Sequence, residues 1–298
     1  MKSGSWLDTV FQICRRENMN KKKGRILVMS AAIMLIIGAV YIYKGSETVD
    51  VTTYQIKSEK INDGIRIALL TDLHSTEIDD GNKKLIQQIK DSKPDIICYS
   101  GDMINWSDTN YEVTLELTKN LVEISPVYYG LGNHEYYKYV KKNRDFMDMF
   151  QKAGATMLNN TYETIEIKGN TIDIGCICEA PEQYEKYKPD IVDRMEQSEH
   201  FKLLLAHVPE LYMGTLNEKD IDLSLAGHAH GGQIRIPYIG GLYSPDQGFL
   251  PKLTAGVHEY NKTTLIISRG LGDHTFVPLI NNNPELVIID ISQEKENQ

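Results

Sequence analysis

Five short polar motifs contain residue types that could bind metal ions. They are Asp72-Leu73-His74, Gly101-Asp102, Gly132-Asn133-His134-Glu135, the isolated His207, and Gly227-His228-Ala229-His230. Aspartate oxygens, a carboxamide oxygen and imidazole nitrogens together suit a pair of divalent metal ions. Two such ions, about 3.5 to 4 Å apart, would clamp a phosphoryl group and activate a bridging water. The motifs therefore predict a dinuclear, metal-dependent phosphoesterase.

Each motif directly follows an apolar, β-rich run that we expect to be a strand. The runs are residues 65–70, 95–100, 126–131, 201–206 and 221–226. In an open α/β sheet, ligands bind in a crevice at the carboxyl ends of the strands. The five separated fragments should therefore converge on one site.

The spacing within the motifs indicates how each residue would bind. Asp72 and His74 are one residue apart, so in an extended backbone both side chains point to the same side. Asp102 follows Gly101, which allows a sharp turn into the crevice, and is placed to bridge the two ions. The remaining predicted metal ligands are Asn133, His207, His228 and His230.

The charge distribution limits the partners. Residues 1–45 carry a formal charge of +6, and the remainder carries −15. Such an acidic body is a poor binder of duplex nucleic acid, so no nucleic-acid partner is expected. Two divalent ions, two aspartates and a hydroxide leave a local charge of roughly +1, which attracts a phosphate ester. The expected partner is a phosphate-ester small molecule or a lipid-linked substrate.

His134 follows a predicted ligand without needing to be one. Its imidazole could donate a proton to the leaving-group oxygen, which makes it the candidate catalytic residue. Glu135 could orient that imidazole by hydrogen bonding. Arg269 and His274 lie in or next to a glycine-rich loop and are candidates for contacting the substrate.

The ordered motifs resemble those of the calcineurin-like metallophosphoesterase superfamily. The match extends over residues 65–233, and the segment Gly227 to Gln233 looks most like a bacterial, membrane-linked branch related to UDP-2,3-diacylglucosamine hydrolase. The resemblance implies a four-layer α/β/β/α sandwich with His134 as the catalytic histidine. It also implies two metal sites: one formed by Asp72, His74, Asp102 and His230, the other by Asp102, Asn133, His207 and His228.

Differences between this sequence and other branches of the superfamily limit which branch it resembles. Protein serine/threonine phosphatases carry an arginine in an extended block after the second aspartate, whereas Asp102 is followed by Met103-Ile104-Asn105. Purple acid phosphatases have a tyrosine ligand shortly after that aspartate, and no tyrosine stands at the needed place. The acidic body and the expected membrane anchor argue against the DNA-repair nucleases.

Residues 26–43 contain no charged side chain. These 18 residues would span about 27 Å as a helix, enough for one transmembrane segment. The basic residues before the segment predict a cytoplasmic N-terminus and an extracytoplasmic catalytic domain in the cell membrane. A cleaved signal peptide is the alternative, and translation could begin at Met19 instead of Met1.

The expected organisation has four parts. A basic cytoplasmic segment (1–25) precedes the anchor (26–43), a linker with a leading strand (44–60) and the metallophosphoesterase domain (61–298). In that domain we expect helices at 83–91, 112–124 and 145–153. We also expect a hairpin of strands 161–168 and 171–178, turning at Gly169-Asn170. The alternation indicates two packed sheets with helices outside.

The metal identity, the reaction and the oligomeric state stay open at the level of sequence. The mixed ligand set does not choose between manganese, iron, zinc and cobalt. An alternative enzyme would cleave the pyrophosphate bond of a nucleotide-linked lipid precursor such as UDP-diacylglucosamine, which should be cytoplasmic and so conflicts with the predicted topology. An alternative of another class is a catalytically silent membrane scaffold. The oligomeric state is not predicted.

Overall fold

The computed structural model describes residues 22–25, 28–30, 33, 48–141, 145–178, 180–272 and 279–294. Contacts divide the chain into two units, Met1–Lys44 and Gly45–Gln298. In the first unit, the described residues are helical and exposed. None of the helices described is long and apolar enough to cross a membrane. Most of the expected anchor, residues 26–43, lies outside the described residues.

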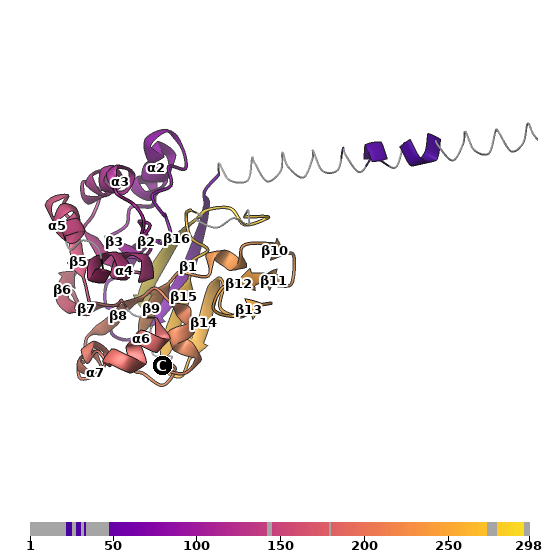
Figure 1. The fold of residues 1–298 in the computed structure, drawn as a ribbon. Coiled ribbons are helices and arrows are strands. Elements are labelled where there is room, and N and C mark those ends of the chain that lie inside the picture. Colours follow the sequence, from indigo (N-terminus) through magenta and orange to yellow (C-terminus); the bar gives the residue numbers. More distant parts are fainter. Residues whose placement is uncertain are drawn as a thin grey trace, which may run out of the picture. The chain divides into compact units, whose positions relative to one another are not determined.

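The second unit contains two six-stranded mixed sheets (Figure 1). In spatial order, the first sheet comprises β1 (Asp50–Ser58), β16 (Glu285–Gln293), β2 (Ile65–Leu70), β3 (Ile96–Ser100), β4 (Val127–Gly130) and β5 (Thr156–Leu158). The second comprises β14 (Gly256–Tyr260), β15 (Thr263–Ile267), β9 (Leu223–Ala226), β8 (Phe201–Ala206), β7 (Asn170–Ile177) and β6 (Tyr162–Ile167). The prediction of two sheets is confirmed.

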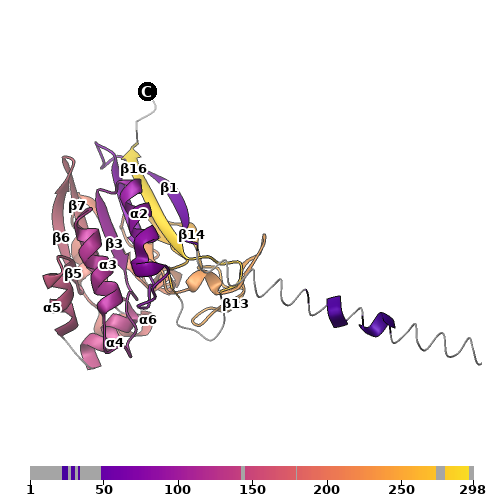
Figure 2. The ribbon, with the colours of Figure 1, turned by 90° about the horizontal axis from the view of Figure 1, so that it is seen from above.

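Helices cover the outer faces. The helices are α2 (Lys83–Ser92), α3 (Glu112–Val122), α4 (Asn133–Lys141), α5 (Asp145–Lys152), α6 (Pro181–Tyr187) and α7 (Ile191–Met195). Helices α2, α3 and α5 pack against the first sheet (Figure 2). Helix α7 packs against the second sheet. The result is an α/β/β/α arrangement, as expected.

Short elements complete the unit. The 3₁₀ turns are η1 (Asp80–Asn82), η2 (Pro209–Met213) and η3 (His230–Gly232). Two small hairpins pair β10 (Arg235–Ile236) with β11 (Gly240–Gly241), and β12 (Tyr243–Ser244) with β13 (Gly248–Phe249). These hairpins were not predicted from the sequence.

The main core lies between the sheets. β3 packs against β8, and β4 against β7. Ile67 of the first sheet and Leu205 of the second belong to the same buried cluster. Full burial of such a side chain contributes about 1.5 to 3 kcal/mol. This shared core fixes the two sheets relative to one another, and with them the loops at their edges.

The predicted β6–β7 hairpin is present, but its turn is shifted by one residue. Ile167 pairs with Asn170, so the turn residues are Lys168 and Gly169. Both have positive φ, 49° and 73°, as a type I′ turn requires. The predicted turn at Gly169-Asn170 was wrong because Asn170 is buried and begins β7.

Candidate metal centre and active site

The five predicted motifs lie at the carboxyl ends of β2, β3, β4, β8 and β9. Backbone hydrogen bonds join neighbouring motifs. The Asp72 N–H donates to the Gly101 carbonyl at 3.0 Å, and the Gly227 N–H donates to the His207 carbonyl at 3.0 Å. The strand ends therefore bring the motifs of both sheets together.

Three overlapping clusters of potential ligand atoms lie within these motifs, and in each the atoms lie within 4.8 Å of one another. One contains Asp72, His74 and His230, and another contains Asp102, His207 and His228. The third contains His74, Asp102 and His134, so Asp102 stands between the first two clusters and His134 lies beside it.

Three imidazoles of the centre share one orientation, with Nδ1 facing a protein oxygen. These contacts join His74 to Asn105 Oδ1 at 3.0 Å, His207 to the Ser100 carbonyl at 2.7 Å and His230 to the Gly272 carbonyl at 3.3 Å. A ring that donates its Nδ1 hydrogen keeps a lone pair on Nε2. Three Nε2 lone pairs therefore face the centre.

Polar atoms without partners mark where cations would fit. Asn133 Oδ1 and His207 Nε2 are buried and have no hydrogen-bond partner. The Nε2 atoms of His74 and His230 lie 3.3 Å apart, close enough for one cation to bind both. Because buried polar atoms normally have partners, this donor set fits divalent metal ions.

Electrostatics at Asp102 favour a positive charge. Burial alone would raise the pKa of Asp102, but the imidazole of His207 holds it well below its usual range. Burial acts to lower the pKa of His207, yet Asp102 and Asp72 raise it to about 10. The His207 Nε2 lies 3.1 Å from Asp102 Oδ2. A proton or a metal ion at this point is therefore strongly stabilised.

The backbone around the first ligands is not extended. Asp72, His74 and Asp102 have φ values of 53°, 49° and 52°, in the left-handed region. The prediction that Asp72 and His74 share a side through strand alternation was therefore wrong, although their ligand atoms do converge. Such costly conformations cluster at functional sites.

Gly101 makes the predicted sharp turn. Its φ is 86°, and a Cβ there would lie 2.5 Å from the Gly132 Cα. Glycine at this position thus allows the β3 and β4 loops to touch, which brings Asp102 against the start of α4. There the His134 N–H donates to Asp102 Oδ1 at 2.8 Å.

The His134 side chain lies beside the clusters and is 8% exposed. Its Nδ1 accepts a hydrogen bond from the Trp106 N–H at 3.3 Å, so the ring hydrogen is on Nε2. Nε2 lies 3.9 Å from Asp102 Oδ2. Burial lowers the pKa of His134 although Asp102 opposes this. The neutral ring is thus favoured, with its Nε2–H as a hydrogen-bond donor.

Glu135 does not orient His134 as predicted. Its buried carboxylate accepts the backbone N–H groups of Asp102 (2.8 Å), Met103 (2.7 Å), Ile104 (3.2 Å) and Gly132 (3.0 Å), and the Tyr129 hydroxyl (2.8 Å). Burial and Asp102 raise the pKa of Glu135 to about 7 against the effect of these donors. Glu135 therefore shapes the loop that carries Asp102.

Arg269 is paired with two carboxylates. Its guanidinium contacts Asp50 Oδ2 at 3.0 Å and Glu285 Oε1 at 3.2 Å. Both partners lie at the start of the paired strands β1 and β16, so these contacts connect the Arg269 loop to the first sheet, and contact with a substrate stays a prediction. His274 lies outside the described residues.

Asp246 was missed by the sequence analysis. Its Oδ2 lies 2.5 Å from His228 Nε2, which leaves Nδ1 of His228 for the cluster. Asp246 lies 18 residues after His228, in the β12–β13 turn. The surrounding Pro-Asp-Gln-Gly sequence indicates a turn and gives no sign of a contact with His228. Asn105, which holds His74, was likewise missed.

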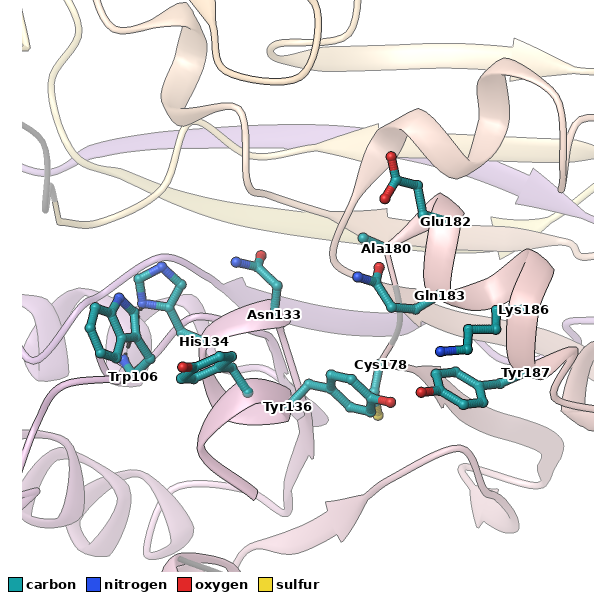
Figure 3. Close-up of a pocket in the computed structure, with 11 residues that line it drawn as sticks. Trp106, Asn133, His134, Tyr136, Cys178, Ala180, Glu182, Gln183, Lys186 and Tyr187 are labelled. Carbon is teal, nitrogen blue, oxygen red and sulfur yellow. Dashed lines mark hydrogen bonds between the residues drawn. The ribbon is translucent and has the colours of Figure 1, made fainter. Parts of the chain in front are cut away.

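A cavity of about 880 Å³ opens beside Asn133 and His134 (Figure 3). Its opposite side is formed by α6. Pockets of this size hold small organic ligands, so the candidate centre has room for the organic part of a substrate.

Comparison with known families agrees with this geometry. The model of the calcineurin-like phosphoesterase family matches residues 65–232, which include all seven predicted ligands and His134. The chain belongs to the calcineurin-like phosphoesterase family. Like other members, it is a metal-dependent phosphoric ester hydrolase.

Several bacterial proteins are similar over most of this calcineurin-like chain. The metallophosphoesterase YkuE of Bacillus subtilis is 28% identical, covering 77% of this chain and 81% of its own. Phosphodiesterase YaeI of Escherichia coli is 25% identical, covering 76% and 82%. YkoQ of Bacillus subtilis is 27% identical, covering 89% and 99%.

Proposed function

We propose that the chain is a dinuclear phosphodiesterase. The observation that carries this proposal is the pair of ligand clusters, with Asp102 between them. One ion would bind Asp72, His74, Asp102 and His230, and the other would bind Asp102, Asn133, His207 and His228. Similarity to a protein named a phosphodiesterase supports diesters as the substrate class.

The chain's own residues supply the other parts of the reaction. Bound divalent ions would polarise the phosphoryl oxygens and lower the pKa of a coordinated water. The Trp106 N–H holds His134 so that Nε2 carries the hydrogen, and this N–H would donate a hydrogen bond that stabilises the charge on the departing ester oxygen. Glu135 keeps the Asp102 loop in place through four backbone N–H groups.

We further propose that residues 26–43 anchor the enzyme in the cell membrane with the catalytic domain outside. The absence of charge in this segment and the basic residues before it support this topology. The relationship to UDP-2,3-diacylglucosamine hydrolases stays a prediction. Release of a nucleoside monophosphate from a nucleotide-linked lipid would favour it.

The test uses the full chain, purified in detergent with added manganese. We expect metal-dependent hydrolysis of bis(p-nitrophenyl) phosphate that exceeds hydrolysis of p-nitrophenyl phosphate. Asp102→Asn should bind less metal and lose nearly all activity, because the residue between the clusters loses its charge. Asp148→Asn, an exposed residue of α5, is the matched control.

Two results would contradict the proposal. If Asp102→Asn loses its activity but keeps the metal content of the wild type, the bridging role is rejected. A folded wild-type chain that binds no manganese, iron, zinc or cobalt and cleaves neither ester would revive the scaffold alternative.

A further inference from the structure

The cavity beside the candidate centre has two unlike walls. Asn133, His134 and Trp106 form the wall next to the metal clusters. Gln183, Lys186 and Tyr187 line the other wall, and Figure 3 shows them across the space from His134. A group attached to the reacting phosphorus could therefore extend from His134 toward α6.

Aromatic side chains dominate the lining. Trp106, Tyr136, Tyr137 and Tyr187 contribute four rings. The rings of Trp106 and Tyr137 pack edge to face, with centroids 5.5 Å apart. Tyr187 is 57% exposed, so part of its ring is available to a ligand. Rings of this kind stack on planar groups, and each base–aromatic stack contributes about 1 to 3 kcal/mol.

Gln183 adds a polar requirement to this aromatic cavity. Its Oε1 is buried and has no hydrogen-bond partner. A buried acceptor without a donor is costly, so a ligand N–H would stabilise it. Lys186 lies one helical turn away from Gln183 and adds a positive charge to the same wall.

We propose, on the basis of the proposed phosphodiesterase function, that this cavity binds a leaving group with a planar, nucleobase-like ring. The ring stacks among the tyrosines and donates an N–H to Gln183 Oε1. The group in the cavity is the leaving group because His134, the hydrogen-bond donor to the departing oxygen, lies on the cavity wall. No described residue other than Gln183 leaves an unpartnered buried oxygen on the α6 side.

The reaction then balances as a hydrolysis. The oxygen of one water molecule bonds to phosphorus while the ester bond from phosphorus to the nucleoside oxygen breaks. The His134 Nε2–H donates a hydrogen bond to the departing oxygen. The proton that the attacking water releases ends on that oxygen, so His134 keeps its hydrogen. The products are a nucleoside and a phosphomonoester.

The decisive test removes only the N–H. Thymidine 5′-monophosphate and its N3-methyl derivative are compared by calorimetry on the manganese-loaded full chain. We expect the unmethylated nucleotide to bind about tenfold more tightly, because the methylated base leaves Gln183 unpaired. In Gln183→Leu the two affinities should become equal. Gln197→Leu, an exposed control, should keep the tenfold difference.

A second variant tests stacking. Tyr187→Ala should lower the affinity for thymidine 5′-monophosphate about tenfold and leave the affinity for ribose 5-phosphate unchanged, since only the base contacts the tyrosine ring. Equal binding of both nucleotides to the wild type, or binding no tighter than that of ribose 5-phosphate, would overturn the inference.

The two proposals fail in different ways. Retained hydrolysis of bis(p-nitrophenyl) phosphate, with no preference for the N–H, rejects the nucleobase site alone. Absence of both metal binding and hydrolysis rejects the phosphodiesterase function itself.

Discussion

At the scale of single residues, hydrogen-bond partners decide which atoms face the centre. His74, His207 and His230 turn Nε2 inward because oxygens hold Nδ1. His228 is the exception, since Asp246 holds its Nε2. The placement of the seven proposed ligands at strand ends could be predicted from sequence, because each follows an apolar run; their binding of metal stays a prediction. The partners of the other ring nitrogens could not be predicted. Asn105, Asp246 and Gly272 lie in loops distant in sequence from the histidines that they contact. The Ser100 and Gly272 partners are backbone carbonyls, which no side-chain pattern reveals.

His134→Asn should separate chemistry from metal binding. We expect kcat for bis(p-nitrophenyl) phosphate to fall about 10²- to 10³-fold, because the shorter asparagine side chain does not carry an N–H to the position of Nε2. Metal content, measured by mass spectrometry of the purified protein, should remain that of the wild type. His200→Asn, an exposed histidine beside Asp173, is the control. Metal loss in His134→Asn would show that the residue is a ligand.

Asp246→Ala should weaken metal binding through His228. Removing the carboxylate frees the ring to rotate, and such losses typically cost 10- to 100-fold in metal affinity. Activity should therefore need a higher manganese concentration, while kcat at saturating metal should change little. Manganese titration of activity measures both. Glu259→Ala, exposed on β14, is the control, and an unchanged titration midpoint in Asp246→Ala would remove Asp246 from the centre.

At the scale of elements, periodicity predicted the strands and helices that bury one face or both. The runs before Asp72 and Asp102 were found because they are mainly apolar, as β2, apart from Arg66, and β3 are buried. Helix α4 was missed because its residues serve the site. Tyr136 and Tyr137 line the cavity instead of forming a regular core-facing stripe.

Asn170 connects the second sheet to the first. Its Oδ1 accepts the Asn62 N–H at 2.7 Å, and its Nδ2 donates to the Asp63 carbonyl at 2.8 Å and to the Ile167 carbonyl at 3.0 Å. Asn62 and Asp63 lie between β1 and β2 of the first sheet, so this buried carboxamide links the two sheets at one edge.

Asn170→Ala should therefore lower the free energy of unfolding by about 2 kcal/mol, because several partly buried backbone groups lose their partner. Urea denaturation followed by circular dichroism measures the change. Asn120→Ala, exposed on α3, should stay within about 0.5 kcal/mol of the wild type. Equal effects of the two substitutions would show that the connection between sheets is unimportant.

At the scale of the whole molecule, strand register places the beginning of the domain near the site. β16 runs antiparallel to β2, with Val287 opposite Leu69, and β1 runs parallel to β16. The first residue of β1, Asp50, therefore lies at the edge where β2 ends, close to Asp72. Six residues lie between Tyr43 and Asp50, and the seven Cα–Cα steps can extend at most about 25 Å.

Deleting residues 26–43 should release the enzyme from membranes. The full chain should sediment with the membrane fraction after a high-salt wash, because about 18 uncharged residues favour the bilayer. The deleted chain should appear in the supernatant with unchanged kcat for bis(p-nitrophenyl) phosphate. A full chain found in the supernatant, or a deleted chain that still sediments without aggregation, would contradict the anchor.

The pairing of β1 with β16 also matters for attaching the protein to a sensor chip. Ser58 is opposite Gln293, so the last strand finishes at the far end from Asp50. Nine residues of strand correspond to about 30 Å. A capture tag fused after residue 298 joins the domain at the end remote from the metal centre, so the centre faces the flowing sample. A tag joined just before residue 48 turns the same centre toward the chip and obstructs the entry of substrate.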